Sequence, residues 1–267
     1  MTSFEFWEKT HTSPYHFPMN ECIWNQSMFE DTDSDGRKLF DTIKLTCVPG
    51  GMIQYGCTAF GFDEAGAISD QVHYSVIRDF AFDDSEVGQT LLKEAMATLE
   101  PEKRIYAFFH YFGMSACARH GKLHESQTHI HSLLIKSGFA VEHENVYYSR
   151  TLCADTPQFD DVTLIWKELN DGSCREFAAQ VDDREVCWGQ VHFLPQGNIA
   201  YLRWIYTDSS RQHEGIGTKV MYALCSNLYN MGIQRFDTDT ASGNIPAQRF
   251  YEKCGFRNEG ITRSYHT

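Results

Sequence analysis

The second half of the chain combines two different hydrophobic periods. Residues 176–181, 186–194 and 199–206 alternate apolar and polar positions and are separated by turn-forming residues, which predicts an antiparallel meander of three strands. From Gly215 to Met231 the apolar residues recur at helical spacing, and Gly232 lies where such a helix would end. The pattern therefore predicts a strand, a loop and a helix in succession.

Further elements follow this helix. Residues 233–240 return to strand character, and Asn244 and Pro246 are residues that favour the start of a helix. A short helix is expected over 247–253, with a final strand from Phe256 onward. The mixture of strands and helices predicts an α/β fold with a mixed sheet.

The first half of the chain shows a fainter version of the same order. Strands are expected over 52–62, 72–82 and 104–112, and helices over 86–99 and 127–136. The clearest echo is between residues 133–139 and 250–256, because each reads as a helix end followed by Gly-Phe. This predicts an internal repeat. The acidic segment 151–161, which contains Pro157, is the expected linker, with domains at 1–155 and 156–267.

Composition narrows the class of protein. A chain of 267 residues that is 42% hydrophobic and 22% charged is expected to fold into two compact units. Acidic residues stand where a signal peptide would be basic, and the most apolar stretch, 105–112, is too short to cross a bilayer. Nine cysteines without a C-x-x-C pair argue against a disulfide framework and a zinc ribbon. We expect a cytoplasmic protein without a membrane helix.

The net charge indicates the kind of partner. A formal charge of −13 repels a phosphate backbone and attracts small cations. Nucleic acid is therefore not expected as a partner, whereas a cationic amine is.

One segment carries candidate chemistry. Residues 211–218, Arg-Gln-His-Glu-Gly-Ile-Gly-Thr, join the last strand of the meander to the following helix. Glycines let the backbone approach a phosphate closely, and a helix N-terminus attracts an anion. A Rossmann fingerprint would need a third glycine where Val220 stands, and no P-loop lysine is present. The segment predicts a diphosphate site of another kind.

Two motifs resemble one family. Gln212, Gly215 and Gly217 match the Gln/Arg-x-x-Gly-x-Gly signature of the GNAT acyltransferase superfamily, and residues 244–256 resemble its downstream segment. The resemblance extends over about residues 161–266. It implies a mostly antiparallel mixed sheet with a splayed central strand, flanked by helices, and with the repeat it implies two such domains.

The resemblance also implies a co-substrate and the residues that bind it. The co-substrate would be acetyl-CoA, without a metal, and the backbone of Ile205 and Thr207 would pair with its pantetheine arm. Asn244 would contact the cofactor, and Tyr251 would protonate the departing thiolate. The loop amides expected to hold the diphosphate are those of Gln212, His213, Glu214, Gly215, Ile216, Gly217 and Thr218.

The implied reaction is acetyl transfer by direct attack of a small-molecule amine. Asp237 and Asp239 lie on one face of a strand and are candidates for the general base, although solvated or structural carboxylates are the more common interpretation. The alternative function is a protein that senses acyl-CoA without transferring the acyl group. Many relatives dimerise, so a homodimer is an open alternative.

Several residues have a plainer interpretation. Tyr251 also fits a core position on an amphipathic helix, and Tyr201, Trp204 and Tyr206 fit strand packing, although exposed aromatic faces would also receive a cationic amine. Five histidines and a cysteine between residues 110 and 131 are of the types that bind zinc, but their spacing matches no standard zinc motif, so no metal site is expected. These residues are His110, Cys117, His120, His124, His129 and His131.

The first half is expected to be a non-catalytic copy. Its counterpart of the glycine loop falls at residues 84–89, where one glycine, Gly88, stands beside acidic residues that would repel a diphosphate. Leu134 stands at the place of the tyrosine and Gln127 at the place of the asparagine.

Overall fold

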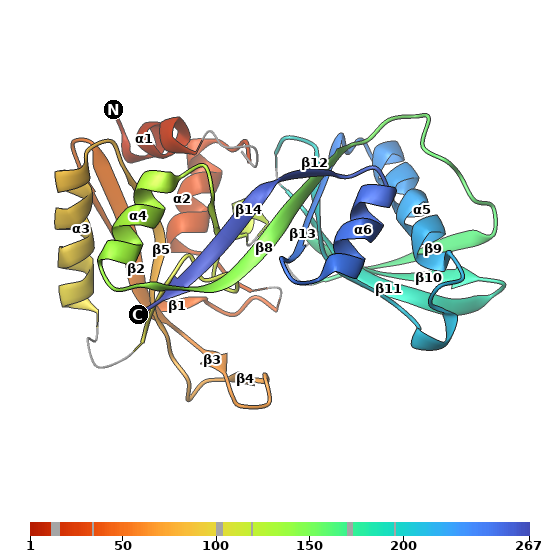
Figure 1. The fold of residues 1–267 in the computed structure, drawn as a ribbon, viewed down its shortest axis with the longest axis horizontal. Helices are drawn as coiled ribbons and strands as arrows, with labels where there is room; N and C mark the ends of the chain where they lie inside the picture. Colours follow the sequence, from red (N-terminus) through yellow and green to blue (C-terminus); the bar gives the residue numbers. More distant parts are fainter. Residues whose placement is uncertain (12–16, 34, 100–103, 119, 170–172, 195) are drawn as a thin grey trace. The chain divides into compact units, whose positions relative to one another are not determined.

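The computed structural model describes residues 1–11, 17–33, 35–99, 104–118, 120–169, 173–194 and 196–267 (Figure 1). The chain forms two compact units. Unit 1 comprises Met1–Asp33, Arg37–Glu144 and Ile261–Thr267, and unit 2 comprises Ser34–Gly36 and Asn145–Gly260.

Unit 1 is a mixed sheet between helices. Its helices are α1 (Ser3–Thr10), α2 (Glu21–Phe29), α3 (Ser85–Thr98) and α4 (Thr128–Lys136), with a 3-10 turn at Ser115–Cys117. Its strands are β1 (Phe40–Val48), β2 (Gly51–Thr58), β5 (Ser75–Phe82), β6 (Ile105–Ala107) and β7 (Leu123–His124), with a small pair, β3 (Gly61–Phe62) and β4 (Ile68–Ser69). The order is β1-β2-β5-β6-β14, and β7 pairs with β14 (Arg257–His266).

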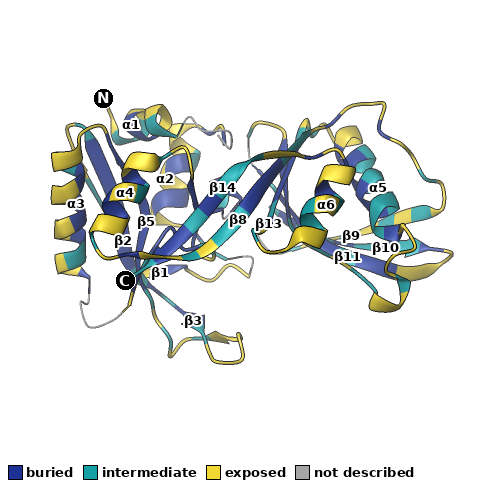
Figure 2. Ribbon diagram, in the orientation of Figure 1, coloured by how far each residue is buried: buried dark blue, intermediate teal, exposed yellow. Residues whose placement is uncertain are grey.

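Apolar side chains of unit 1 form separate clusters. One cluster joins β2 and β5 to α3 and α4, with Ile53, Phe80, Leu91 and Leu134 among its buried members. A second joins Leu39, Phe40, Phe60, Val76 and Phe112. Figure 2 shows β2 and β5 of unit 1 mostly dark blue beneath the partly yellow helices α3 and α4, as expected of amphipathic helices that cover a sheet.

From Cys174 onward, unit 2 follows the order predicted from the sequence, whereas its strands over 140–151 and 162–168 were not predicted. Its strands are β8 (Ala140–Thr151), β9 (Val162–Glu168), β10 (Cys174–Val181), β11 (Arg184–Phe193), β12 (Ile199–Thr207) and β13 (Arg235–Ala241). A 3-10 turn (Ser209–Arg211) and α5 (Ile216–Asn230) connect β12 to β13, and α6 (Ile245–Lys253) follows. The sheet order is β8-β13-β12-β11-β10-β9.

The predicted meander is confirmed. Strands β9, β10, β11 and β12 pair antiparallel in sequence, whereas β12 and β13 pair parallel across α5. Trp166 on β9 donates its indole N–H to Oδ1 of Asn227 on α5 at 3.0 Å, and it stands opposite Phe177 on β10. Because residues directly opposite share a sheet face, α5 covers the face that carries Phe177, Gly189 and Ile205.

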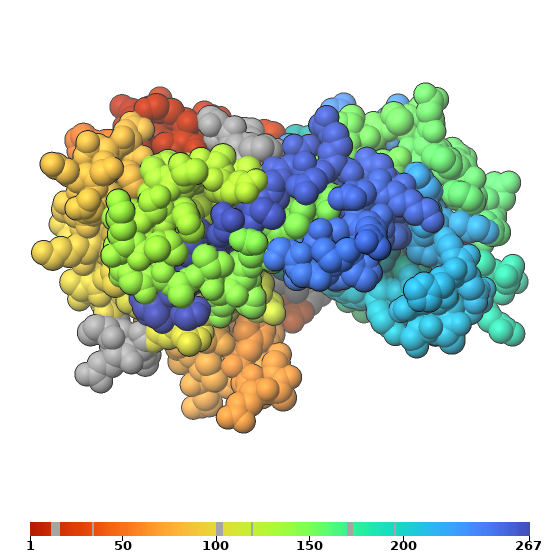
Figure 3. Space-filling view, viewed as in Figure 1, coloured from red at the N-terminus to blue at the C-terminus, as the bar shows by residue number. Residues whose placement is uncertain are grey.

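The division into units differs from the boundary expected at 155/156. Strand β8 continues to Thr151 and pairs with β13 from Asn145 onward, so the chain enters unit 2 before the acidic segment. The last strand, expected in the C-terminal domain, ends in unit 1, where Tyr265 pairs with Ala107 and Thr262 with His124. Figure 3 shows parts of the dark-blue C-terminal segment among yellow and green residues of unit 1.

Other expectations are met in part. The strand expected over 104–112 is limited to β6, and the pattern gave no warning of α1, α2 or β1. The nine cysteines, all within the described ranges, form no disulfide there. In the portion of the chain that the structure describes, no helix has the length and apolar character needed to cross a membrane.

Candidate active site

The central strand of unit 2 carries a bulge that opens the sheet. The register between β11 and β12 passes from Gln190 opposite Trp204 to Val191 opposite Leu202, which leaves Arg203 as the extra residue. Parallel pairing of β12 with β13 ends at Leu202 opposite Thr238, and no later pair joins them within the described residues. Because a bulge bends its strand, the edge of β12 that faces β13 has no pairing partner beyond Arg203 among the described residues.

The backbone groups on this edge can be assigned. The N–H of Asp208, just after β12, donates to the carbonyl of Val186 on β11 at 2.9 Å. Backbone groups alternate in direction along a strand, so the N–H and C=O groups of Ile205 and Thr207 face away from β11, toward the open edge. The side chain of Gln212 supports this assignment, because its Nε2 donates to the Thr207 carbonyl from the open edge at 3.1 Å.

The glycine loop begins where this edge ends. His213 and Gly215 have φ angles of 67° and 80°, and Gly215 is the N-cap of α5. The N–H groups of Thr218 and Lys219 bond the Gly215 carbonyl, so those of Ile216 and Gly217 precede the first bonded turn. These N–H groups and the positive end of the helix dipole make an anion site.

Tyr251 lies beside the point where β12 and β13 stop pairing. Its side chain is on α6, 6% exposed, and its hydroxyl hydrogen-bonds Thr238, the last residue of β13 that pairs with β12. Burial is the largest influence and raises the pKa of Tyr251. The phenol therefore keeps its proton at neutral pH and is a donor rather than a base.

Asn244 holds the start of α6. Its Oδ1 accepts the N–H of Ala247 at 3.3 Å, and its Nδ2 donates to Oγ1 of Thr240 at 3.2 Å. This is the N-cap geometry that fixes the helix on which Tyr251 stands.

Asp237 and Asp239 are both engaged within the protein. The carboxylate of Asp237 is fully buried and accepts the hydroxyls of Tyr147 and Ser149 at 2.7 Å and Nε of Arg235 at 2.9 Å. Asp239 accepts the hydroxyl of Tyr201 at 2.9 Å. Burial is the largest influence on Tyr147 and Tyr201, and together with the nearby carboxylates it raises the pKa of both hydroxyls well above the usual value. The contacts favour structural carboxylates.

Aromatic side chains gather on the sheet face opposite α5. Trp188 and Tyr206 stand opposite each other on β11 and β12, with their rings at 6.3 Å and an interplanar angle of 21°. Trp204 and Tyr206 are 45% and 50% exposed, whereas Tyr201 is buried. The sequence analysis missed Trp188, although its place opposite Tyr206 follows from the meander register.

Unit 1 repeats the opening. The register between β2 and β5 shifts so that Arg78 is the extra residue, and parallel pairing of β5 with β6 ends at Ile77 opposite Ala107. The N–H of Asp83 donates to Gly50 at 2.8 Å, so the backbone groups of Phe80 and Phe82 face the open edge.

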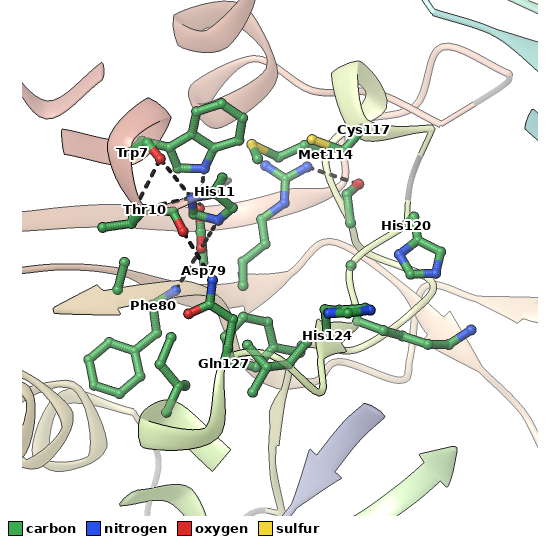
Figure 4. A pocket seen from close by; sticks show the side chains of 18 of the residues that line it. Trp7, Thr10, His11, Asp79, Phe80, Met114, Cys117, His120, His124 and Gln127 are labelled. Atoms are coloured by element: carbon green, nitrogen blue, oxygen red, sulfur yellow. Dashed lines mark hydrogen bonds and ion pairs between the residues drawn. The ribbon is translucent and has the colours of Figure 1, made fainter. Parts of the chain in front are cut away.

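In unit 1, side chains of the protein bond part of this edge. Asp79 accepts the N–H of Phe80 at 2.8 Å, as the dashed line in Figure 4 shows, and the ring of His129 hydrogen-bonds the Phe82 carbonyl. At the start of α3, Asp84 is the N-cap and its carboxylate accepts the N–H groups of Glu86 and Val87. The donors that a diphosphate would need there are already bonded to a carboxylate.

The histidines weighed as metal ligands make other contacts. Nδ1 of His131 lies 2.9 Å from the Tyr265 hydroxyl, and Nδ1 of His124 accepts the N–H of Ser126 at 3.2 Å. Over the ranges that the structure describes, there is no group of three or more His, Cys, Asp or Glu side chains able to hold a metal ion.

The sequence profile of the Acetyltransferase (GNAT) family matches residues 141–256. No curated protein sequence matches the chain. The match contains β12, the glycine loop, α5, β13 and α6, which together surround the opening in unit 2.

Solved structures share the fold at low sequence identity. A tandem GNAT protein from the clavulanic acid biosynthesis pathway is 10% identical, with a TM-score of 0.65 over 100% of this chain and 95% of that chain. A GCN5-related N-acetyltransferase from Kribbella flavida is 12% identical, with a TM-score of 0.52 over 93% and 96%. The expected architecture, two GNAT-like domains with mixed sheets, is confirmed.

Removing the Asp237 carboxylate tests its structural role. Asp237→Ala leaves two hydroxyls and the Arg235 guanidinium without their acceptor, so we expect the free energy of unfolding to fall by about 3 kcal/mol in urea titrations. The exposed Asp155→Ala is the control and should change it by less than about 0.5 kcal/mol. A variant of unchanged stability would contradict the structural role.

Proposed function

Because residues 141–256 match the acetyltransferase (GNAT) family, we propose that unit 2 transfers an acetyl group from acetyl-CoA to the nitrogen of a small amine. The family implies acyl-CoA-dependent acetyl transfer. The observation that carries the proposal is the unpaired edge of β12, which runs from the bulge at Arg203 to the anion site at the start of α5.

The edge and the loop fit the two ends of acetyl-CoA. The backbone groups of Ile205 and Thr207 would bond the amides of the pantetheine arm, because such groups require partners when they are covered. The loop from Gln212 to Thr218, through His213, Glu214, Gly215, Ile216 and Gly217, would hold the diphosphate. Asn244 stays a candidate contact, although its side chain already caps α6.

The proposed chemistry follows from the side chains near the point where β12 and β13 stop pairing. The neutral amine would attack the thioester carbonyl carbon, the carbon–sulfur bond would break, and the Tyr251 hydroxyl would give its proton to the departing thiolate. Thr238, which bonds that hydroxyl, fixes its position. The amine must also lose a proton, and with Asp237 and Asp239 engaged elsewhere, water is the acceptor that the contacts favour.

Exposed aromatics support a cationic acceptor. Trp204 and Tyr206 stand on β12 next to the unpaired edge, on the face opposite α5, and both are about half exposed. A carboxylate, Glu185, accepts the Trp188 indole N–H at 3.2 Å beside them. Aromatic faces and a nearby carboxylate attract a cation, as does the net charge of −13.

Unit 1, by contrast, is proposed as the non-catalytic copy. Asp79, His129 and Asp84 bond the backbone groups that correspond to those offered by unit 2. The residue at the place of Tyr251 is Leu134, which is fully buried and has no proton to give.

Glycine 217 tests where acetyl-CoA binds. A Cβ there would lie 3.3 Å from Oγ1 of Thr207, so Gly217→Glu puts a carboxylate into the anion site. We expect micromolar binding of acetyl-CoA by calorimetry, weakened about 100-fold in this variant by charge repulsion. Gly217→Gln, which adds similar bulk without charge, should weaken it less. Equal binding to all three proteins would refute this site.

Tyrosine 251 tests the transfer step. With a cationic amine that supports thiol release, Tyr251→Phe should lower kcat about 100-fold while acetyl-CoA binding is kept, because a general acid is lost and the ring stays. Tyr148→Phe is the matched control: Tyr148 is buried, its ring lies 5.6 Å from that of Tyr251, and its hydroxyl bonds Glu252 instead. Tight binding without thiol release from any amine would support the acyl-CoA sensor instead.

A further inference from the structure

A cavity of about 500 Å³ lies within unit 1 (Figure 4). It is bounded by the open edge of β5, the start of α4, residues 113–117 and 120–124, and the end of α1. This volume is within the range typical of pockets for small molecules. Its apolar wall is formed mainly by Phe80, Phe82, Phe108, Met114, Leu123 and Ile130.

The charged side chains of the wall are paired with other groups of the protein. Arg78 donates to Asp31 and to the carbonyls of Ser27 and Phe112, and Lys9 bonds Asp83 at 2.8 Å. The other basic side chains of the wall, Lys122 and His120, also have interaction partners.

His11 and Asp79 form a further pair in the wall (Figure 4). Nδ1 of His11 lies 2.9 Å from the Trp7 carbonyl and Nε2 lies 3.3 Å from Asp79, so both ring nitrogens face acceptors. Burial is the largest influence and lowers the pKa of His11, but Asp79 and the carbonyl together raise it above its usual value. Asp79 also accepts the Trp7 indole N–H at 2.8 Å, so its carboxylate is engaged by two side chains of the protein.

Cys117 and His129 in the wall are uncharged at neutral pH. Burial raises the pKa of the Cys117 thiol far above neutral, and burial lowers the pKa of His129. Among the described residues of the wall, a charged ligand would lose its hydration without gaining an unpaired counter-charge.

Gln127 offers a hydrogen-bond acceptor in the wall. It donates its Nε2 to the carbonyl of Thr10 at 3.0 Å, which leaves Oε1 to accept from a ligand. On the open edge, the N–H of Phe80 is already bonded to Asp79 and the carbonyl of Phe82 to His129.

We propose that this cavity binds a neutral, ring-containing apolar molecule that donates one hydrogen bond to Oε1 of Gln127. Aromatic walls favour a flat ring through stacked and edge contacts. The site is separate from the acetyl transfer proposed for unit 2. Unit 1 would bind a neutral ligand, whereas unit 2 would bind the anionic acetyl-CoA.

Paired fluorescent probes test this site in the full chain. We expect saturable one-to-one binding of 2-naphthol, with 2-naphthoate, which has the same rings and a negative charge, binding at least about tenfold more weakly. Gln127→Leu should weaken the binding of 2-naphthol by about two- to tenfold, because one hydrogen bond is lost. The Gln127 side chain makes no cap bond to α4, so the helix should survive this change.

A cavity-filling variant locates the probe. Met114→Trp should abolish 2-naphthol binding, whereas Ile135→Trp, which adds the same side chain at an exposed position of α4, should leave it unchanged. Circular dichroism verifies that each variant is folded, and if Met114→Trp is not, Gln127→Leu decides. The proposal is overturned if 2-naphthol fails to saturate the folded wild-type protein, if the naphthoate binds as tightly, or if folded Met114→Trp or Gln127→Leu binds 2-naphthol like the wild type.

Discussion

Backbone N–H and C=O groups inside a sheet need partners, and both units of this protein open their sheets at a bulge in the central strand. Arg78 and Arg203 are the extra residues, and in each unit the parallel pairing stops at the residue before the bulge. Beyond that point one edge of the strand has backbone groups with no neighbouring strand. What satisfies them decides what each unit can bind.

The two units satisfy this edge in different ways. In unit 2 the edge at Ile205 and Thr207 leads to a helix start capped by Gly215, which has no side chain to occupy the anion site. In unit 1 the carboxylates of Asp79 and Asp84 bond the corresponding donors. The same opening is thus proposed to hold an extended anionic co-substrate in unit 2, whereas in unit 1 it borders a cavity whose charged side chains are paired within the protein.

Local features of the site were predictable from the sequence, whereas long-range pairings were not. The glycine loop, α5 and the N-cap role of Asn244 depend on neighbouring residues, so spacing and composition revealed them. The bulge at Arg203 and the return of β14 to unit 1 depend on pairing between distant segments, which no local pattern records. Asp79 looked like an ordinary strand residue, because its contacts with Trp7 and His11 come from a helix far away in the chain.

The central claim, that acetyl-CoA completes the open edge of β12, is tested most directly by hydrogen–deuterium exchange of backbone amides with and without acetyl-CoA. The account predicts that acetyl-CoA slows exchange at Ile205 and Thr207 and across the loop at 212–218, and leaves the edge of unit 1 at Phe80 and Phe82 unchanged. Slower exchange at Phe80, Phe82 and the start of α3, with β12 unaffected, would contradict it.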